Sequence, residues 1–149
     1  MNAKPVRLAS LGLGWWSDVL AAAVGRAGGV EIAACYTRSE DKRKAFADKF
    51  GGRAASSYEE ILADPDIDGI INTTPNNVHL ETTKQAAEAG KHVFLDKPIA
   101  NSVGEGMQIA KLCRDAGVKL SIGFQRRREA HFRWVREQID AGEFGQLVQ

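Results

Sequence analysis

Hydrophobic residues along the chain follow two different periods. Short apolar runs that stop at a glycine or a polar turn are typical of strands buried in a parallel sheet. We expect such strands at residues 6–11, 30–36, 69–73, 93–95 and 118–124, and a sixth apolar stretch begins at Leu147. Between these runs, apolar residues recur every three or four positions, which predicts amphipathic helices. The predicted helices span residues 16–27, 39–50, 57–62, 76–89, 102–117 and 129–141.

Serine residues mark several of the predicted helix starts. Ser39 precedes two acidic residues and is expected to be an N-cap. Ser57 with Glu60, and Ser102 with Glu105, have the spacing of a capping box.

Strands and helices therefore alternate, with short connections between them. Parallel neighbours need crossover connections, and these connections are right-handed. The pattern predicts an α/β fold with one doubly wound parallel sheet of about six strands and helices on both faces. No repeat, low-complexity tract or linker interrupts it.

Composition narrows the class of protein. The 149 residues suffice for about one domain, and 44% hydrophobic with 26% charged residues is typical of a globular protein. Twenty basic against nineteen acidic residues leave a net charge of +1, which argues against a nucleic-acid or membrane-surface binder. No apolar stretch reaches the ~18 residues of a membrane span, and the N-terminus enters the first strand with no signal peptide pattern. We expect a soluble cytoplasmic domain.

Both cysteines lie in apolar runs. Cys35 belongs to the second predicted strand and Cys113 to a predicted helix. In a reducing cytosol such residues are expected to be buried free thiols, with a disulfide as the alternative.

A glycine-bearing loop joins the first predicted strand to the first predicted helix. This is the place of the dinucleotide fingerprint G-x-G-x-x-G/A, in which the glycines permit a tight turn and close approach of a pyrophosphate. Ser17 replaces the third glycine and is small enough for close helix–strand packing. We expect a dinucleotide to contact Gly12, Leu13, Gly14, Trp15 and Trp16. A purely structural turn is the alternative, and the two tryptophans could instead pack beneath the loop.

The end of the second predicted strand bears on cofactor choice. An NAD-binding domain places a carboxylate there, about 20 residues beyond the fingerprint, to bind the ribose 2′-hydroxyl. This chain has Thr37, Arg38 and Ser39 instead, and the first acid after this strand is Glu40. A guanidinium with two hydroxyls suits a 2′-phosphate, so we expect NADP(H) in preference to NAD(H). The alternative is that Arg38 is a solvated loop residue.

Three further segments complete a recognisable set. TTPNNVH at 73–79 follows a strand, GKHVFLDKP at 90–98 follows the next helix, and SIGFQRR at 121–127 ends the last predicted strand. Together with the glycine loop, and in this order, they resemble the Gfo/Idh/MocA oxidoreductases, a family named after glucose–fructose oxidoreductase and inositol dehydrogenase. The resemblance covers essentially the whole chain and implies a Rossmann-type dinucleotide-binding fold.

The resemblance also implies roles for individual residues. Lys97 corresponds to the family's catalytic lysine beside the nicotinamide, where an ammonium polarises or helps to deprotonate the substrate hydroxyl. Asp96, which stands where the family usually has glutamate, is expected to contact the cofactor. The turn of Thr74, Pro75 and Asn76 is expected beneath the cofactor's ribose and pyrophosphate. Gln125 and Arg126 are expected at the mouth of the nicotinamide pocket.

Other polar residues receive non-catalytic or no roles. His79 is expected to be a structural hydrogen-bonding residue rather than a catalytic one. His92 and His131 are given no role, and no Cys/His cluster has metal-ligand spacing, so no metal site is predicted. The arginine run between Arg126 and Arg136 is expected to be a solvated or inter-domain face.

Family members continue from this point into a second domain with an open antiparallel sheet. That domain supplies substrate contacts, a catalytic histidine and usually the oligomer interface. We expect residues 1–124 to form the dinucleotide-binding domain and 125–149 to begin the connection to a substrate domain that this sequence lacks. Apolar residues from Phe132 onward would then be uncovered, which predicts self-association.

The resemblance implies a reaction as well as a fold. The complete protein is expected to be a homo-oligomer that transfers hydride between NADP(H) and a secondary alcohol or ketone of a sugar, cyclitol or related polyol. The chain alone is expected to be inactive. The alternative is a non-catalytic dinucleotide-binding sensor or partner subunit.

Overall fold

A six-stranded parallel sheet forms the centre of the computed structural model, which describes residues 4–148. The strand order is β3-β2-β1-β4-β5-β6, and every neighbouring pair is parallel. The strands are β1 Val6–Leu11, β2 Val30–Tyr36, β3 Arg53–Ala54, β4 Gly69–Asn72, β5 His92–Leu95 and β6 Leu120–Ile122. The α-helices are α1 Trp15–Ala27, α2 Glu40–Phe50, α3 Tyr58–Ala63, α4 His79–Glu88, α5 Val103–Asp115 and α6 Ala130–Asp140. Two 3-10 helices, η1 Asn76–Val78 and η2 Gln125–Arg128, precede α4 and α6.

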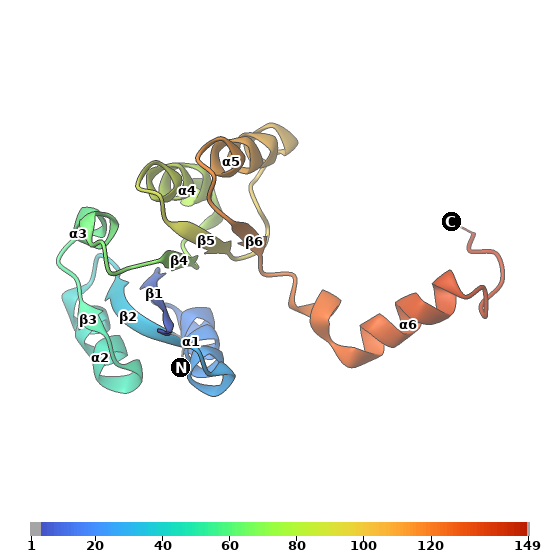
Figure 1. The fold of residues 1–149 in the computed structure, drawn as a ribbon, viewed down its shortest axis with the longest axis horizontal. Helices are drawn as coiled ribbons and strands as arrows, with labels where there is room; N and C mark the ends of the chain where they lie inside the picture. The colour runs from blue at the N-terminus through green and yellow to red at the C-terminus, as the bar shows by residue number, and fades with distance from the viewer. Residues whose placement is uncertain (1–3, 149) are drawn as a thin grey trace.

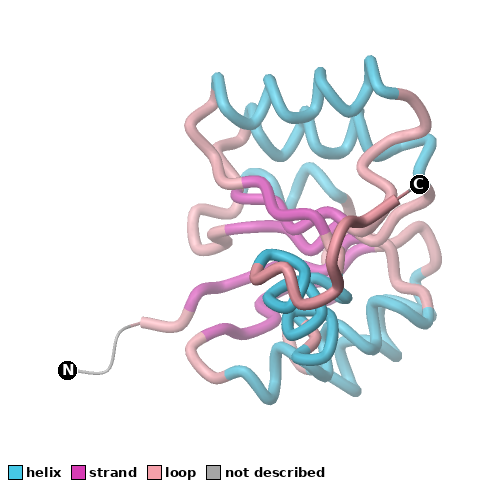
Figure 2. Tube along the Cα trace, turned by 90° about the vertical axis from the view of Figure 1, so that its right-hand side faces the viewer, coloured by secondary structure: helices cyan, strands magenta, loops and turns pink. Residues whose placement is uncertain are grey.

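Helices cover both faces of the sheet. In Figure 1, α4 and α5 lie on one face, and α1 and α2 lie on the other. Figure 2 shows the strands as a layer between these two sets of helices. The chain moves outward from β1 to β3, then returns to β4 beside β1 and moves outward in the other direction. Right-handed crossovers then place the two sets of helices on opposite faces. The predicted doubly wound α/β fold is confirmed.

Two hydrophobic clusters lie on the two sides of the sheet. Side chains of successive strand residues point to opposite faces, so neighbouring residues of β4 belong to different clusters. Ile70 packs in one cluster with Ile109 of α5. Ile71 packs in the other with Ala21 of α1 and Phe46 of α2. All these side chains are buried, which explains why β4 is apolar at consecutive positions.

The structure differs from the prediction at the edges of the sheet. β3 was not predicted, because Arg53 and Ala54 are exposed and form no apolar run. The expected strand at 118–124 is shortened to Leu120–Ile122, and residues 145–148 around Leu147 form no strand. The expected helix at 76–89 is divided into η1 and α4. The sixth strand is therefore β3, which lies at the edge of the sheet beside β2.

The three predicted serine caps are present. Ser39, Ser57 and Ser102 each accept a hydrogen bond at the side-chain oxygen from the backbone N–H three residues later. In a standard capping box the glutamate side chain accepts from the N–H of the N-cap residue itself, and the two boxes here depart from that pattern. Glu60 accepts from the N–H of Ser56, and Glu105 accepts from the N–H of Asn101, so each carboxylate reaches the residue before the N-cap.

Cys35 and Cys113 are buried free thiols, as expected. Burial raises the pKa of both thiols, and the Cys35 Sγ donates a hydrogen bond to the Arg43 carbonyl at 3.5 Å. Among the described helices, none is long and apolar enough to cross a membrane.

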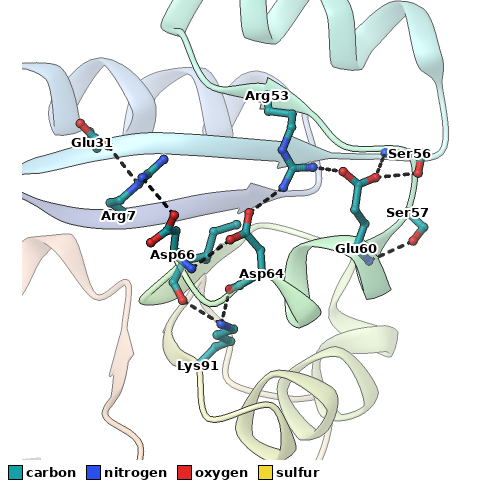
Figure 3. Close-up of polar contacts among 10 residues, drawn as sticks. Arg7, Glu31, Arg53, Ser56, Ser57, Glu60, Asp64, Asp66 and Lys91 are labelled. Atoms are coloured by element: carbon teal, nitrogen blue, oxygen red, sulfur yellow. Dashed lines mark hydrogen bonds and ion pairs between the residues drawn. The ribbon is translucent and has the colours of Figure 1, made fainter.

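Charged side chains at the amino ends of the strands are paired (Figure 3). Lys91 is only 7% exposed, and its Nζ donates to the carbonyls of Asp64 at 2.6 Å and Ile67 at 2.9 Å. Arg7 forms ion pairs with Glu31 at 3.2 Å and with Asp66 at 3.9 Å. These contacts join the segments that precede β4 and β5 to the start of β1.

Helix α6 extends away from the sheet in Figure 1. It is amphipathic, yet none of its side chains is buried. Phe132, Trp134 and Val135 are 38%, 55% and 38% exposed.

Candidate functional site

The predicted site residues follow the strands at one edge of the sheet. Because all six strands are parallel, the loops after their carboxyl ends gather at the same edge. The chain reverses its direction of winding between β1 and β4, and the crevice at such a switch point is where open α/β sheets bind ligands. All the predicted cofactor-binding and catalytic residues lie directly after β1, β2, β4, β5 and β6, either in the loops or in the first residues of α1, η1 and η2.

Gly12 makes the turn after β1. Its φ is +83°, and its N–H donates to the Tyr36 carbonyl of β2 at 3.0 Å. A Cβ at this position would lie 2.8 Å from backbone atoms of Thr73 and Thr74. The Thr73 hydroxyl also donates to the Gly12 carbonyl at 2.5 Å. Glycine is therefore required both by the backbone conformation and by contact with the loop after β4.

Gly14 has a different environment. Its φ of −105° and ψ of −176° suit any residue, and a Cβ built on it has no atom within 4 Å. Gly14 is the N-cap of α1, and no side chain caps this helix. The first turn of α1 therefore presents backbone N–H groups to an open space, which is an arrangement that favours an anion. This geometry fits the pyrophosphate of a dinucleotide.

Leu13 in the loop and three residues in the first turn of α1 surround this position. Leu13 packs partly buried against the core cluster of α1 and α2. Ser17 is fully buried and donates to the Gly14 carbonyl at 2.7 Å, so it allows the close helix–strand packing expected at the third fingerprint position. Trp15 is 77% exposed, and packing beneath the loop is therefore wrong for this residue. Trp16 is half-buried, with its ring centroid 5.5 Å from that of Trp15.

The loop after β4 is fixed by a buried amide. Asn72 is 1% exposed, and its Oδ1 accepts from the Thr74 N–H at 3.1 Å and from the Thr74 hydroxyl at 2.7 Å. Its Nδ2 donates to the Thr82 hydroxyl on α4 at 2.8 Å. Pro75 and Asn76 are exposed beyond this point. The predicted turn is thus rigid at Thr74 and open to solvent at its tip.

His79 joins this turn to the segment that carries Lys97. The ring is 1% exposed, with Nε2 at 2.9 Å from the Thr74 carbonyl and Nδ1 at 3.0 Å from the Pro98 carbonyl. A neutral ring donates to one of these oxygens according to its tautomer, whereas a cationic ring donates to both. The structural role expected for His79 is consistent with this burial.

Asp96 and Lys97 follow β5, next to the loop after β4. The Asp96 N–H donates to the Asn72 carbonyl at 2.9 Å, which sets the spacing of the two loops. The Lys97 side chain is exposed. Asp96 Oδ1 is buried without a hydrogen-bond partner in the described structure, and a Cβ on Gly123 would approach it to 3.2 Å. The site therefore offers an exposed ammonium beside a partly buried carboxylate.

Gln125 and Arg126 lie in η2, after β6, and both are exposed. Gln125 borders a cavity of about 580 Å³ whose wall also includes Trp16, Phe94 and Ile122. Arg126 points toward α6 instead, with its guanidinium carbon 5.5 Å from the centroid of Phe132. Only Gln125 of this predicted pair therefore lines the cavity beside α1.

Thr37, Arg38 and Ser39 form the turn between β2 and α2. Ser39 caps α2 through its side chain, so its hydroxyl oxygen is already engaged. The Arg38 side chain is exposed, and among residues 4–148 it has no hydrogen bond or ion pair. Arg43 fixes the turn, because its Nη1 donates to the carbonyls of Thr37 at 2.7 Å and Arg38 at 3.3 Å.

Two residues that shape the site had no predicted role. Asn72 could have been noticed as a polar residue at the end of the apolar run 69–72, where a buried amide must have partners. Arg43 gives no such signal, because a lysine- and arginine-rich helix start looks like a solvated surface. Within the described part of the chain, no group of three His, Cys, Asp or Glu side chains is placed to hold a metal ion.

Known proteins share this fold and sequence pattern. The profile of the Gfo/Idh/MocA family, described as an oxidoreductase family with an NAD-binding Rossmann fold, matches residues 6–124. The 1,5-anhydro-D-fructose reductase of Ensifer adhaerens is 34% identical over 124 residues, which are 83% of this chain and 37% of that protein.

Two solved structures show the likeness in three dimensions. The WlbA dehydrogenase of Bordetella pertussis, in complex with NADH and UDP-GlcNAcA, has a TM-score of 0.91 and 28% identity, covering 98% of this chain and 42% of that one. A 3-ketoreductase of Actinomadura kijaniata, in complex with TDP-benzene and NADP, has a TM-score of 0.87 and 26% identity, covering 93% and 44%. The chain spans less than half the length of each of these proteins. With the family profile matched across the whole sheet, the chain belongs to the Gfo/Idh/MocA family of oxidoreductases and is similar to its NAD-binding Rossmann domain.

Proposed function

We propose that this chain binds NADP(H) in an oxidoreductase that transfers hydride to or from a secondary alcohol or ketone of a sugar, cyclitol or related polyol. The observation that carries the proposal is the open space at Gly14, where an uncapped helix start faces the switch point of the sheet. Activity on a sugar is supported by the anhydrofructose reductase relative. The two related structures differ in their cofactor, because the 3-ketoreductase contains NADP and the WlbA dehydrogenase contains NADH.

The chain's own residues have separable tasks in this reaction. When bound, a nicotinamide ring donates or accepts the hydride. The N–H groups in the first turn of α1 bind the pyrophosphate, and the turn at Thr74 supports the ribose. Lys97 directs its ammonium at the substrate hydroxyl, where it holds the oxygen and assists removal of its proton. His79 fixes the Pro98 carbonyl, which directly follows Lys97, relative to the Thr74 carbonyl.

The preference for NADP(H) rests on the turn after β2. Arg38 is exposed and unpaired within the described residues, and between the end of β2 and Glu40 there is no acid that would repel a 2′-phosphate. Glu40 itself is paired with Lys44 at 2.8 Å. A hydrogen bond to a charged group contributes roughly 1.5–3 kcal/mol, and each ~1.4 kcal/mol is a tenfold change in affinity. We therefore expect NADPH to bind about 10- to 100-fold more tightly than NADH, with a smaller ratio at high salt.

Arg38→Ala tests this assignment. The dissociation constants of NADPH and NADH are measured by titration calorimetry for the unmutated chain, for Arg38→Ala and for Arg26→Ala. Arg26 is a suitable control because it is an exposed arginine at the far end of α1. Arg38→Ala should remove most of the preference and leave NADH binding nearly unchanged, whereas Arg26→Ala should change neither. Equal affinities for the two cofactors in the unmutated chain, or an equal loss of both in Arg38→Ala, would refute the preference.

A further inference from the structure

An arginine-lined cleft lies where the chain leaves the sheet. The cleft has a volume of about 510 Å³ and lies between η2 and α6. Its walls are formed by Arg126, Arg127, Phe132, Arg133, Arg136 and Glu137. The volume is within the range of small-molecule sites, roughly 300–1,000 Å³.

Most of the positive charge in the cleft is not neutralised. Arg136 pairs with Asp140 at 2.8 Å. Arg126, Arg127 and Arg133 have no ion pair within residues 4–148, and Glu137 is the one acid on the wall. Like charges held this close together repel each other, and a bound anion would offset that repulsion. The net charge of the whole chain is only +1, so the positive charge of the cleft is a local feature and does not reflect a generally basic protein.

The side chains that line the cleft indicate which class of anion it binds best. Guanidinium groups present paired N–H donors that match phosphoryl oxygens, and several of them here surround one space. Phe132 adds an aromatic face, which Arg126 covers at 5.5 Å from the ring centroid. This contact holds the Arg126 guanidinium at the wall of the cleft, where its N–H donors suit a phosphoryl group.

We propose that this cleft binds the phosphoryl group of a phosphorylated sugar or cyclitol substrate. The proposal rests on the proposed function, because Arg126 directly follows Gln125, which lines the cavity beside α1. The arginines of η2 and α6 would hold the phosphoryl group, and the carbohydrate ring would extend from the cleft toward the carboxyl ends of β5 and β6. Phosphate recognition and hydride transfer would then occupy adjacent parts of one substrate site.

The test compares a phosphorylated and a neutral sugar on the same chain. Glucose 6-phosphate and glucose are titrated calorimetrically into protein saturated with NADPH, so that phosphate cannot bind at the glycine loop. The double variant Arg133→Gln/Arg136→Gln removes the α6 side of the cleft. The matched control is Arg26→Gln/Arg114→Gln, which removes two exposed arginines in the last turns of α1 and α5. Far-UV circular dichroism confirms that both variants are folded.

We expect glucose 6-phosphate to bind at least tenfold more tightly than glucose. Arg133→Gln/Arg136→Gln should weaken the binding of glucose 6-phosphate at least tenfold, and the control pair should weaken it less than twofold. The affinity for NADPH should be the same in the unmutated chain and in both double variants. Equal binding of the two sugars, or equal losses in the two double variants, would overturn the proposal. So would tighter binding of a single-stranded oligonucleotide, which would indicate a nucleic-acid site. If NADPH itself does not bind, the proposed function fails, and the same titrations without NADPH still decide whether the cleft binds phosphate.

Discussion

Gly12 and Gly14 lie two residues apart in the same loop, yet substitution by alanine should affect them in opposite ways. Gly12 has a φ of +83°, and its missing Cβ would lie 2.8 Å from the backbone of Thr73 and Thr74. Gly14 has an ordinary extended conformation and free space around its Cβ position. We expect Gly12→Ala to destabilise the fold and Gly14→Ala to weaken cofactor binding.

The magnitudes follow from these two environments. A left-handed conformation costs a non-glycine residue about 1–2 kcal/mol, and forcing extra atoms into a packed region costs about 1–3 kcal/mol. Gly12→Ala should therefore lower the free energy of unfolding by about 2–5 kcal/mol. For Gly14→Ala the change should stay within about 1 kcal/mol, because alanine restricts the unfolded chain but is a poorer N-cap than glycine.

Urea denaturation and NADPH titration separate the two effects. Gly14→Ala should retain the stability of the unmutated chain and bind NADPH at least tenfold more weakly, because its methyl group occupies the space open to the pyrophosphate. Gly104→Ala is a useful control, since Gly104 is exposed in α5 and has no atom near its Cβ position. Unchanged NADPH affinity in Gly14→Ala would refute the assignment of the pyrophosphate. Unchanged stability in Gly12→Ala would refute the tight contact between the two loops.

Two other expectations follow from burial and exposure. His79→Ala should lower the free energy of unfolding by about 3–5 kcal/mol in urea, because it leaves a cavity at a buried ring and removes the donor from the part-buried carbonyls of Thr74 and Pro98. A loss under about 1 kcal/mol would contradict the bridging role. The exposed apolar side chains Phe132, Trp134 and Val135 should cause self-association at high concentration, which sedimentation velocity would detect and Trp134→Ser should reduce. A clean monomer at high concentration would contradict that expectation.

The sequence allowed most of the fold to be predicted because its apolar runs stop at clear boundaries. The bounds of β1 and β2 agree with the prediction, since Gly12 ends one strand and Gly29 precedes the other. β3 could not be predicted in this way. It has only two residues, both exposed, and it exists because Arg53 and Ala54 pair with Ala34 and Cys35 of β2. Such a strand depends on its neighbour rather than on its own composition.

The candidate site was predictable in position but not in detail. Motifs place residues after particular strands, and parallel topology then gathers those residues at one edge. The motifs do not show which side chains already form hydrogen bonds within the protein. Ser39 was predicted both to cap α2 and to contact the cofactor, and the structure shows the cap. Arg43 looks solvated in the sequence, but it holds the turn beside Arg38. Trp15 departs from the general rule that large apolar side chains pack inside, because it is 77% exposed.

Cations at the amino ends of the strands are satisfied differently from those at the carboxyl ends, and this difference supports the proposed position of the anionic cofactor. At the amino ends, Lys91 donates to two carbonyls and Arg7 faces Glu31 and Asp66, so these charges have partners within the protein (Figure 3). At the carboxyl ends, Arg38 and Lys97 have no carboxylate partner among residues 4–148. A paired cation attracts an incoming anion weakly because its field is already compensated, whereas an unpaired one near the surface retains its field over about a Debye length, ~8–10 Å. The net charge of +1 conceals this asymmetry. An anionic dinucleotide is thus favoured at the carboxyl edge by the local balance of charge as well as by the open helix start at Gly14.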